Sequence, residues 1–392
     1  MRLILNQPHF VYTYSMISLP VIQSPIAPGF IDLGLGDPAF FLLPLDLLRA
    51  STAECFARGD NSFLQYGAEQ GSGPFREALA DFLTRGYGLP VGPESLFATH
   101  GASGALDLTC TLFTRPGDTV FVEEPSYFLA LRIFRDHDLR IVPIPTDADG
   151  LVVDAVEEKL SAAQPKFIYT IPTFQNPSGQ TLITERRARL VALAREHNFL
   201  IVADEVYHFL DYTRKPPAPF AAYTAEGNVL AINSFSKILA PGLRLGWIES
   251  DAETVRRFVT CGMLDSGGGL NPFASAVVRE TLEKGGVEKN IQNLRTVYRS
   301  RAQRMESALK KYLPDAQFQS PAGGFFFWVR LPGMDTSALQ KKAEAFQVGF
   351  RPGVRFSSAG GLKDFMRLSF VHYEADEIEE GIARLRDCVE AE

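Results

Sequence analysis

Short apolar runs alternate with helical patterns through the middle of the chain. Seven of these runs have the length and hydrophobicity of buried strands. They are Leu96–Thr99, Thr119–Glu123, Arg140–Pro143, Lys166–Ile171, Leu200–Ala203, Val229–Asn233 and Leu243–Glu249. Helical patterns lie between several of them, at Gly104–Phe113, Tyr127–Asp136, Asp154–Ala163 and Thr184–His197, the last with Thr184 as its N-cap. This alternation predicts an α/β fold in which a mostly parallel, seven-stranded sheet lies between helices.

The two ends of the chain show a different pattern. Residues 1–60 are rich in proline and irregular, and then become helical. The C-terminal part contains a long basic helical pattern, an alternating aromatic and aliphatic run, a short strand and a final helix, at Val287–Leu313, Gly324–Val329, Met366–Phe370 and Ala375–Glu390 respectively. We therefore predict a large domain over residues 61–285 and a smaller α+β domain formed jointly by residues 1–60 and 286–392.

Composition and charge exclude several classes of protein. The 392 residues are 46% hydrophobic and 22% charged, which suffices for a large buried core. The formal net charge of −7 argues against binding to the phosphate backbone of a nucleic acid. No apolar run approaches the roughly 18 residues of a membrane span, and the first residues lack a secretory pattern, so we expect a cytoplasmic protein that binds no membrane. The four cysteines and six histidines show no metal-binding spacing.

The segment with the most specific chemistry surrounds Lys237. Ser234 and Ser236 precede this lysine, and Arg244 follows it after a Pro-Gly pair. A residue at the carboxyl end of a parallel strand faces the crevice where such sheets bind ligands. An isolated Ser-x-Ser-Lys is more often a surface turn, but two hydroxyls and a guanidinium around an amine form a phosphate cradle beside a nucleophile. That combination indicates an aldehyde cofactor with a phosphate tail, bound to Lys237 as a Schiff base.

An electron-accepting pyridine ring also needs a carboxylate that keeps its ring nitrogen protonated. Asp204 ends a continuous apolar strand, and Tyr207 follows three residues later at the strand–helix turn. In isolation Asp204 and Glu205 would also fit the solvated start of a helix. Asn176 can donate its amide to the phenolate oxygen of such a ring, although Asn-Pro-Ser-Gly alone is merely a turn.

Two further segments follow predicted strands. The turn Gly101-Ala102-Ser103 opens a helix, and the backbone N–H groups at a helix start bind anions. We expect His100, which precedes this turn, to be a packed or surface residue without a role in the chemistry. Tyr127 follows the next strand and is placed to stack on a flat ring.

In this order the segments resemble fold-type-I pyridoxal 5′-phosphate (PLP) aminotransferases of class I and II. The residues around Lys237, with Gly323–Pro332 and Phe350–Gly353, are similar to the branch that contains 2-aminoadipate and kynurenine aminotransferases. The resemblance extends from about Asp32 to Leu385. It implies the fold-type-I fold, PLP as the cofactor, and transfer of an amino group from an L-amino acid to a 2-oxo acid such as 2-oxoglutarate or pyruvate. The kinetics would be ping-pong through pyridoxamine phosphate.

The resemblance also implies a role for each candidate residue. Lys237, Asp204 and Tyr207 are the catalytic group, with Lys237 as Schiff-base lysine and general base. The cofactor contacts that it implies are Tyr66, Gly101, Ala102, Ser103, Tyr127, Asn176, Asp204, Tyr207, Ser234, Ser236, Lys237 and Arg244. Arg367 binds the substrate α-carboxylate, with Gly36 and Asn176 beside it. Tyr66 reaches in from the other subunit, which implies a homodimer with shared active sites.

Two departures from the family pattern bear on the site. Ala102 stands where this branch often has a hydroxyl residue, so one phosphate hydrogen bond is missing. Ser266–Asn271, with Gly267–Gly269 at its centre, is unusually rich in glycine. This segment either widens the pocket for the substrate side chain or forms a flexible loop. Phe40, Phe41 and Tyr14 lie in the N-terminal region that contributes to the pocket in this branch, which slightly favours an aromatic or long aliphatic donor.

Two other functions use the same fold. A PLP-dependent lyase, such as a cysteine-conjugate β-lyase, needs the same residues as an aminotransferase. A ligand-sensing domain of a GntR-type transcription regulator is less favoured. The residues before the large domain show no helix-turn-helix pattern and no basic patch.

Overall fold

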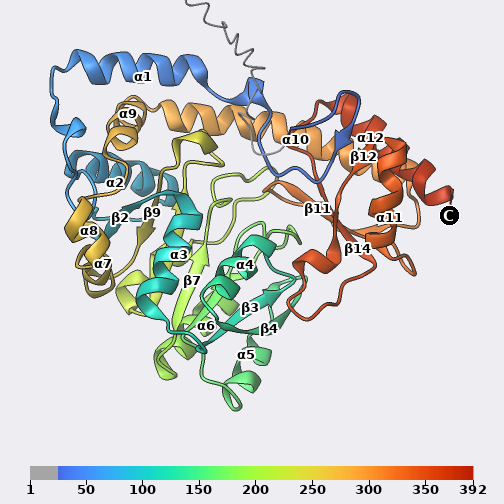
Figure 1. Ribbon diagram of the computed structural model, residues 1–392, viewed down its shortest axis with the longest axis horizontal. Coiled ribbons are helices and arrows are strands. Elements are labelled where there is room, and N and C mark those ends of the chain that lie inside the picture. Colours follow the sequence, from blue (N-terminus) through green and yellow to red (C-terminus); the bar gives the residue numbers. More distant parts are fainter. Residues whose placement is uncertain (1–24, 392) are drawn as a thin grey trace, which may run out of the picture.

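The computed structural model describes residues 25–391, and its centre is an eight-stranded sheet (Figure 1). The strands lie in the order β2-β9-β8-β7-β6-β3-β4-β5 across the sheet. Their bounds are β2 Leu96–Thr99, β3 Thr119–Glu124, β4 Arg140–Asp147, β5 Gly150–Leu151, β6 Phe167–Thr170, β7 Leu200–Asp204, β8 Val229–Ser234 and β9 Gly246–Glu249. The five strands from β8 to β4 run parallel, whereas β9 is antiparallel to β2 and β8. The predicted α/β fold with a mostly parallel sheet is confirmed. The eighth strand, β5, adds two residues antiparallel to β4.

Helices cover both faces of this sheet. The helices are α1 Leu45–Ala57, α2 Gly73–Tyr87, α3 Gly101–Phe113, α4 Phe128–Asp136, α5 Val153–Leu160, α6 Thr184–Glu196, α7 Ala252–Val259, α8 Gly262–Gly267, α9 Pro272–Glu283, α10 Gly286–Tyr312, α11 Thr336–Ala343 and α12 Ala375–Glu390. Successive side chains of a strand point to opposite faces. Val202 of β7 accordingly packs in the core that contains α3 and α4, while Ile201 and Ala203 pack in the core that contains α5 and α6.

The start of α6 differs from the prediction. Thr184 is the first helical residue, and Ile183 is the N-cap, without a side-chain cap hydrogen bond. The buried Arg187 fixes the segments that lead into α6, because its Nε donates to Leu182 O at 2.9 Å and its Nη2 donates to Pro172 O at 2.7 Å. The prediction of Thr184 as N-cap is therefore wrong. The guanidinium also satisfies carbonyl groups that a threonine hydroxyl cannot reach.

A second, smaller sheet lies beside α11 and α12. It is antiparallel in the order β10-β11-β14-β13, with bounds β10 Gln317–Phe318, β11 Phe326–Arg330, β13 Arg351–Pro352 and β14 Phe365–Ser369. Near the start of the described chain, β1 (Ile31–Asp32) pairs in parallel with β12 (Val348–Gly349). Segments from both ends of the chain therefore meet here. The division of the chain at residues 60 and 285 stays a prediction.

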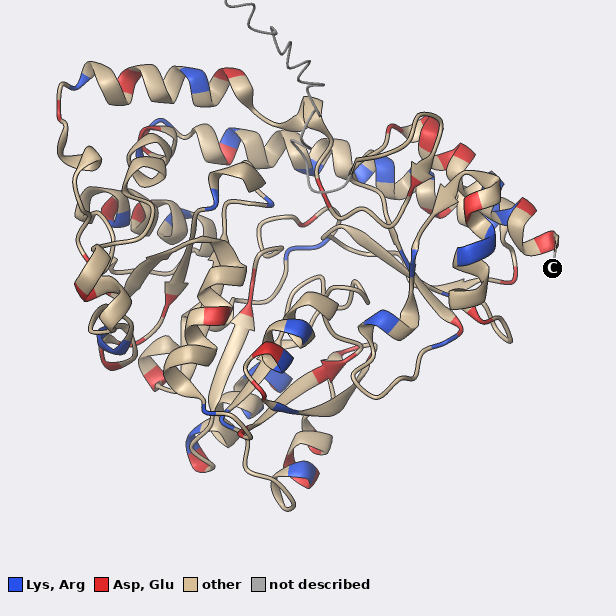
Figure 2. Ribbon diagram, in the orientation of Figure 1, with Lys and Arg blue, Asp and Glu red and all other residues tan. Residues whose placement is uncertain are grey.

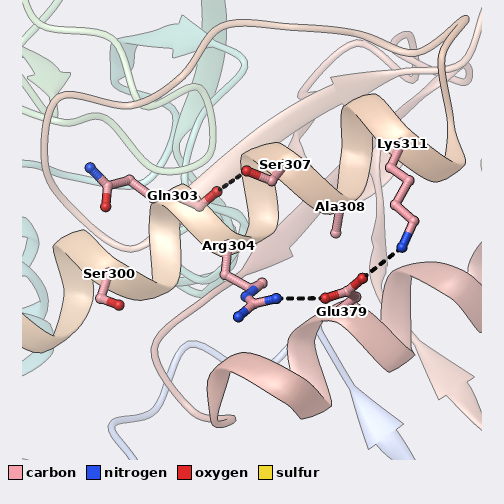
Figure 3. A pocket seen from close by; sticks show the side chains of 7 residues that line it. All are labelled: Ser300, Gln303, Arg304, Ser307, Ala308, Lys311 and Glu379. Atoms are coloured by element: carbon pink, nitrogen blue, oxygen red, sulfur yellow. Dashed lines mark hydrogen bonds and ion pairs between the residues drawn. The ribbon is translucent and has the colours of Figure 1, made fainter.

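The outer helices α10 and α12 pack against each other near the C-terminus (Figure 1). Glu379 of α12 accepts hydrogen bonds from Arg304 at 2.7 Å and Lys311 at 3.0 Å, and these side chains line a shallow pocket (Figure 3). Figure 2 shows acidic and basic residues interspersed over the helices. Within residues 25–391, no helix combines the length and the apolar character needed to cross a bilayer.

Candidate active site

Apart from Tyr66, the predicted site residues gather at one edge of the large sheet. Asp204 is the last residue of β7, and Lys237 follows β8. Asn176 follows β6, and Tyr127 follows β3. The carboxyl ends of these parallel strands share an edge, and α3 starts at the same edge after β2. This is the edge at which open α/β sheets bind ligands. The pocket between α10 and α12 shares no residue with this group.

The amine of Lys237 is held close to a glycine carbonyl and an aromatic ring. Its Nζ donates to Gly36 O at 3.1 Å and lies 5.2 Å from the centroid of Phe325. Burial lowers the pKa of Lys237, the Asp37 carboxylate opposes that shift, and the positive charge of Arg367 adds to it. A lowered pKa leaves more of the amine neutral, which is the form that can attack a carbonyl or accept a proton.

The carboxylate of Asp204 is buried, and only one of its two oxygen atoms accepts a hydrogen bond from the described residues. Its Oδ2 accepts a hydrogen bond from the Tyr169 hydroxyl at 2.9 Å, whereas Oδ1 is buried without a partner among the described residues. Burial raises the pKa of Asp204 to about 6, and hydrogen bonds from Tyr169 and the Val206 backbone oppose the rise. A buried carboxylate oxygen without a donor is costly, so this atom matches a cationic donor such as a protonated ring nitrogen.

The phosphate candidates surround the start of α3. The Arg244 backbone is left-handed, and its Nη2 donates to His100 O at 3.3 Å. Gly101 has φ +77°, and a Cβ there would lie 3.2 Å from that same Nη2, so the close approach requires glycine. The N-cap His100 makes no side-chain cap hydrogen bond, which leaves the first N–H groups of α3, those of Ala102 and Ser103 among them, facing this space.

The two serines before Lys237 differ in their environment. Ser234 is buried, and its hydroxyl contacts Ser236 Oγ at 2.9 Å and Leu245 O at 3.2 Å. Ser236 is only partly buried, and its backbone N–H donates to Ser234 Oγ at 3.1 Å. Ser234 therefore fixes the turn, while Ser236 is the more accessible hydroxyl of the pair.

Arg367 lies at the centre of the smaller sheet, on β14, and points to the same space. Its Nη1 donates to Asn176 Oδ1 at 2.9 Å, and its Nη2 donates to Gly34 O at 2.8 Å. Its Nε is buried, and no hydrogen-bond partner for it is found within residues 25–391. Burial lowers the pKa of Arg367 to about 10, so the guanidinium stays charged at neutral pH. Gly36 is also here, since a Cβ on it would lie 3.9 Å from Arg367 Nη2.

Two tyrosines and an amide complete the group. Tyr127 precedes α4, and burial raises its pKa to about 12. Tyr207 is buried with its ring 5.3 Å from the Phe325 ring, centroid to centroid, and burial raises its pKa. A hydrogen bond from Asn176 opposes that rise. Because Arg367 occupies Oδ1 of Asn176, the amide NH₂ is the group that faces Tyr207.

Comparison with known proteins agrees with this geometry. The sequence profile of the family "Aminotransferase class I and II" matches residues 28–385. The chain belongs to this family. It is 36% identical over 370 residues to an aromatic-amino-acid aminotransferase of Thermococcus litoralis, covering 92% of this chain and 88% of that protein. It is 32% identical to the 2-aminoadipate transaminase of Thermus thermophilus, covering 91% and 89%.

Solved structures give the same result. The kynurenine aminotransferase of Pyrococcus horikoshii, solved in complex with PMP, matches with a TM-score of 0.87 and 34% identity, over 92% of this chain and 91% of that one. The chain is therefore a PLP-dependent aminotransferase of the branch that the sequence resembles. The orphaned Oδ1 of Asp204, the amine of Lys237 and the glycine-lined start of α3 fit PLP.

Sequence reasoning missed a pair of residues behind this aminotransferase site. Glu123 is buried at the end of β3 and accepts hydrogen bonds from Thr170 Oγ1 at 2.6 Å and Ile171 N at 2.9 Å. Gln175 Nε2 donates to Glu123 at 3.1 Å and to Pro125 O at 2.8 Å. Gln175 thus ties the loop before Tyr127 to its own loop, which contains Asn176. The sequence did contain a signal for this pair, because Glu123 is a charged residue in an otherwise apolar strand and such a residue is rarely buried without hydrogen-bond partners.

Tyr66 is not part of this cluster within one chain. Its side chain is 79% exposed, and a Cβ on Gly268 would lie 3.1 Å from its Cβ. The backbones of Gly67 and Gly269 pair here, with Gly269 N donating to Gly67 O at 2.7 Å. A Cβ on Gly269 would overlap Ala68 O. The two segments thus pack against each other. The close approach of their backbones explains why residue 269 is glycine.

The arginine on β14 yields a first prediction. Replacement of Arg367 by alanine or lysine should lower kcat/KM for amino acids about a hundredfold or more, because alanine loses the charged contact with the α-carboxylate and lysine loses its two-pronged geometry. Bound cofactor should keep its visible absorbance. An amine without a carboxylate, such as phenethylamine, should react no more slowly in the variants than in the wild type. Unchanged kcat/KM for phenylalanine would show that another residue binds the carboxylate.

Proposed function

We propose that this aminotransferase takes its amino group from an aromatic or long aliphatic L-amino acid and passes it to a 2-oxo acid such as 2-oxoglutarate or pyruvate. One observation carries the donor preference. The Arg367 guanidinium is surrounded by aromatic rings, with its carbon 4.0 Å from the centroid of Phe326, 5.1 Å from that of Phe356 and 6.0 Å from that of Phe128. A side chain next to a carboxylate held there meets an apolar wall.

The aromatic residues singled out from the sequence contribute differently. Phe40 and Phe41, in the short helix η1 (Phe40–Leu42), are exposed, and they contact His372 and Arg301 respectively. Tyr14 lies outside the described residues. The donor proposal therefore rests on the rings around Arg367 and on the names of the related enzymes, which include an aromatic-amino-acid and a kynurenine aminotransferase.

The geometry supports a role for each residue in the proposed mechanism. When bound, PLP accepts the electron pair released at the substrate Cα. Lys237 would hold the cofactor and would serve as the general base that moves the proton from the substrate Cα, which its lowered pKa permits. Asp204 Oδ1 would keep the ring nitrogen protonated, and the Asn176 amide and the Tyr207 hydroxyl would bind the ring oxygen. Arg367 fixes the α-carboxylate and so orients the Cα–H bond.

The remaining cofactor contacts in the proposal are Tyr127 on the ring face, and Ser234, Ser236, Arg244 and the turn Gly101-Ala102-Ser103 around the phosphate. Gly36 lies beside the substrate carboxylate. The hydroxyl of Ser236 and the guanidinium of Arg244 carry most of the anion binding, because Ser234 is engaged within its turn. A cytoplasmic location, expected from the sequence, is part of the proposal.

A donor panel tests the proposal. The purified holoenzyme is mixed with single amino acids in the absence of any acceptor, and the loss of cofactor absorbance is followed. Phenylalanine, tyrosine, kynurenine and leucine should react faster than serine or glycine, by about tenfold or more, because two or three buried methylene equivalents separate them. Equal rates across the panel would contradict the donor preference.

A homodimer with shared sites is also part of the proposal. Besides Tyr66, four large apolar side chains on α1, η2 (Ser62–Leu64), α8 and α9 are 48–66% exposed, namely Phe56, Leu64, Met263 and Phe273. Phe56, Phe63 and Phe273 form an aromatic cluster with centroids 5.6–6.3 Å apart. Exposed apolar patches on soluble proteins mark interfaces, and a second copy of the chain is the occupant that would bring Tyr66 to a site.

Complementation tests the shared site. Lys237→Ala should be inactive, and Tyr66→Phe should hold PLP weakly. In a mixed dimer one site carries both defects, while the other has an intact Lys237 and receives an intact Tyr66 from its partner. Refolding the two variants together should raise activity at limiting PLP above the parental average, to at most about a quarter of wild type for random pairing. No rise, with mixed dimers confirmed by mass, would remove Tyr66 from the partner's site.

A further inference from the structure

An ion pair close to Arg367 has no role in the mechanism described above. Asp32 ends β1 and Arg351 begins β13, so the two partners lie 319 residues apart in the chain. Arg351 donates from Nη1 and Nη2 to the two carboxylate oxygens of Asp32, at 3.0 and 2.9 Å. The side chains of Arg351 and Asp32 are only 20% and 16% exposed. A two-pronged pair with so little exposure has a defined geometry, and loss of one partner leaves a poorly solvated charge.

Asp32 also holds the turn that contacts Arg367. The backbone N–H of Gly34 donates to Asp32 Oδ1 at 2.9 Å, and the carbonyl of the same glycine accepts from Arg367 Nη2 at 2.8 Å. One residue therefore separates the carboxylate from the guanidinium. Two residues beyond Arg367 on β14, Ser369 N donates to Leu33 O at 2.6 Å. The strand that carries Arg367 is thus bound to this turn at two points.

Arg351 packs against the same turn. A Cβ on Gly34 would lie 2.5 Å from Arg351 Nη1, so this close approach requires glycine. Two residues further on, Gly36 O accepts a hydrogen bond from Lys237 Nζ at 3.1 Å. The segment that the ion pair holds therefore contacts both the arginine of β14 and the candidate Schiff-base lysine.

The charges around Arg367 are balanced by the same pair. Arg351 and Arg367 lie directly opposite each other in the antiparallel pairing of β13 with β14, where like charges repel. Burial lowers the pKa of Arg367, the charge of Arg351 adds to that shift, and the Asp32 carboxylate opposes it. Arg367 itself donates to uncharged oxygens of Asn176 and Gly34. Asp32 therefore compensates Arg351, and the charge of Arg367 is left for a substrate carboxylate.

We propose that Asp32 and Arg351 are positioning residues for the α-carboxylate site, because their ion pair fixes the turn bound to Arg367 and cancels the charge opposite it. Neither residue contacts the substrate or the cofactor in this arrangement. The roles of the pair depend on the proposed function of Arg367 in binding the α-carboxylate. Because the two partners carry opposite charges, their single substitutions should have different kinetic effects.

Arg351→Met leaves an uncompensated carboxylate one residue away from Arg367, where it competes with the substrate carboxylate. The half-saturating amino acid concentration should rise about tenfold or more, with the maximal rate within about threefold. Asp32→Asn keeps an oxygen that can accept from Gly34 N–H but leaves Arg351 charged. The substrate carboxylate is then shared between two cations, so the maximal rate should fall about tenfold without a rise in half-saturation. The double variant is neutral and keeps the turn, so both parameters should return to within about threefold of wild type.

The test follows the half-reactions of the holoenzymes with phenylalanine and with alanine by cofactor absorbance. Both donors should change by the same factor, because they share the α-carboxylate. Binding of 3-phenylpropionate is measured by calorimetry as a readout without turnover. Its Kd should rise about tenfold or more in Arg351→Met and recover in the double variant. Arg330→Met is the matched control, since exposed Arg330 of β11 forms an ion pair with Asp364 at 2.6 Å in the same sheet. This control should behave as the wild type.

Three results would overturn the inference. One is an unchanged Kd of 3-phenylpropionate in Arg351→Met. Another is a set of losses that add in the double variant, which would mean that the pair only stabilises the fold. A third is a loss confined to phenylalanine, which would place the pair beside the substrate side chain. A wild type that prefers alanine, with both single variants altered as stated, would contradict the donor preference and support the inference. If the wild type reacts with neither donor and binds no 3-phenylpropionate, the proposed role of Arg367 falls together with the inference.

Discussion

Lys237→Ala is expected to lose at least about a thousandfold in transamination rate, and borohydride should fix no cofactor to the variant. The variant lacks the amine that holds the aldehyde, and it lacks the base that moves the Cα proton. The surroundings already favour a reactive amine, because burial lowers the pKa of Lys237 beside Gly36 O and the Phe325 ring. Alanine replaces the lysine without adding a charge to this buried space.

The measurement is mass spectrometry of tryptic peptides after reduction. In the wild type the cofactor mass should sit on the peptide that contains Lys237. Lys341→Ala, at an exposed position of α11, is the matched control and should label as the wild type does. A borohydride-stable adduct of full stoichiometry in Lys237→Ala would assign the role to another lysine.

Asp204→Asn should retain PLP but lose rate by about a thousandfold or more, on the order of 4 kcal/mol. The orphaned Oδ1 of Asp204 is the atom that would accept from the ring nitrogen, and an amide lacks the charge that keeps this nitrogen protonated. Tyr169 supports the carboxylate through its 2.9 Å hydrogen bond to Oδ2. Steady-state kcat at saturating PLP, with cofactor content checked by absorbance, measures the effect. A loss below tenfold would mean that Asp204 only starts the turn after β7.

The same substitution should have the opposite effect on the stability of the cofactor-free protein. Burial raises the pKa of Asp204 to about 6, so its ionisation opposes folding. The neutral carboxyl therefore favours the folded state. Its stabilising contribution is fully present below the unfolded pKa of about 4 and is lost as the pH rises through the folded pKa. Cofactor-free Asp204→Asn should therefore melt higher than the cofactor-free wild type at pH 8, and the difference should shrink by pH 4. A constant difference across this range would contradict a raised pKa.

The strands and the positions of the candidate site residues that follow them were predictable for a shared physical reason. Parallel strands that are buried on both faces appear in the sequence as continuous apolar runs. A polar residue at the end of such a run indicates a candidate ligand site at the sheet edge. Asp204 ends such a run and Lys237 follows one three residues later, so the signal for both is local in the sequence. The two-residue strand β5 has no pattern of its own, since it depends on pairing with β4.

Other features depend on contacts between distant segments. The pairing of Gly67 with Gly269 and the close approach of Gly101 to Arg244 have no local sequence signal. At the start of α6, the buried guanidinium of Arg187 donates to carbonyls of two preceding segments, and no side chain caps the helix. The link from Glu123 through Gln175 to Pro125 likewise joins loops about 50 residues apart. Such contacts become visible only in the folded chain.

One measurement tests the central claim most directly. Holoenzyme is mixed with excess phenylalanine and no 2-oxo acid, and the 2-oxo acid, ammonia and cofactor are quantified after a single half-turnover. An aminotransferase should release one phenylpyruvate per active site, convert the cofactor to pyridoxamine phosphate, form no ammonia and then stop until 2-oxoglutarate or pyruvate is added. Continued turnover with stoichiometric ammonia, or an unchanged cofactor spectrum with every donor tried, would contradict the account.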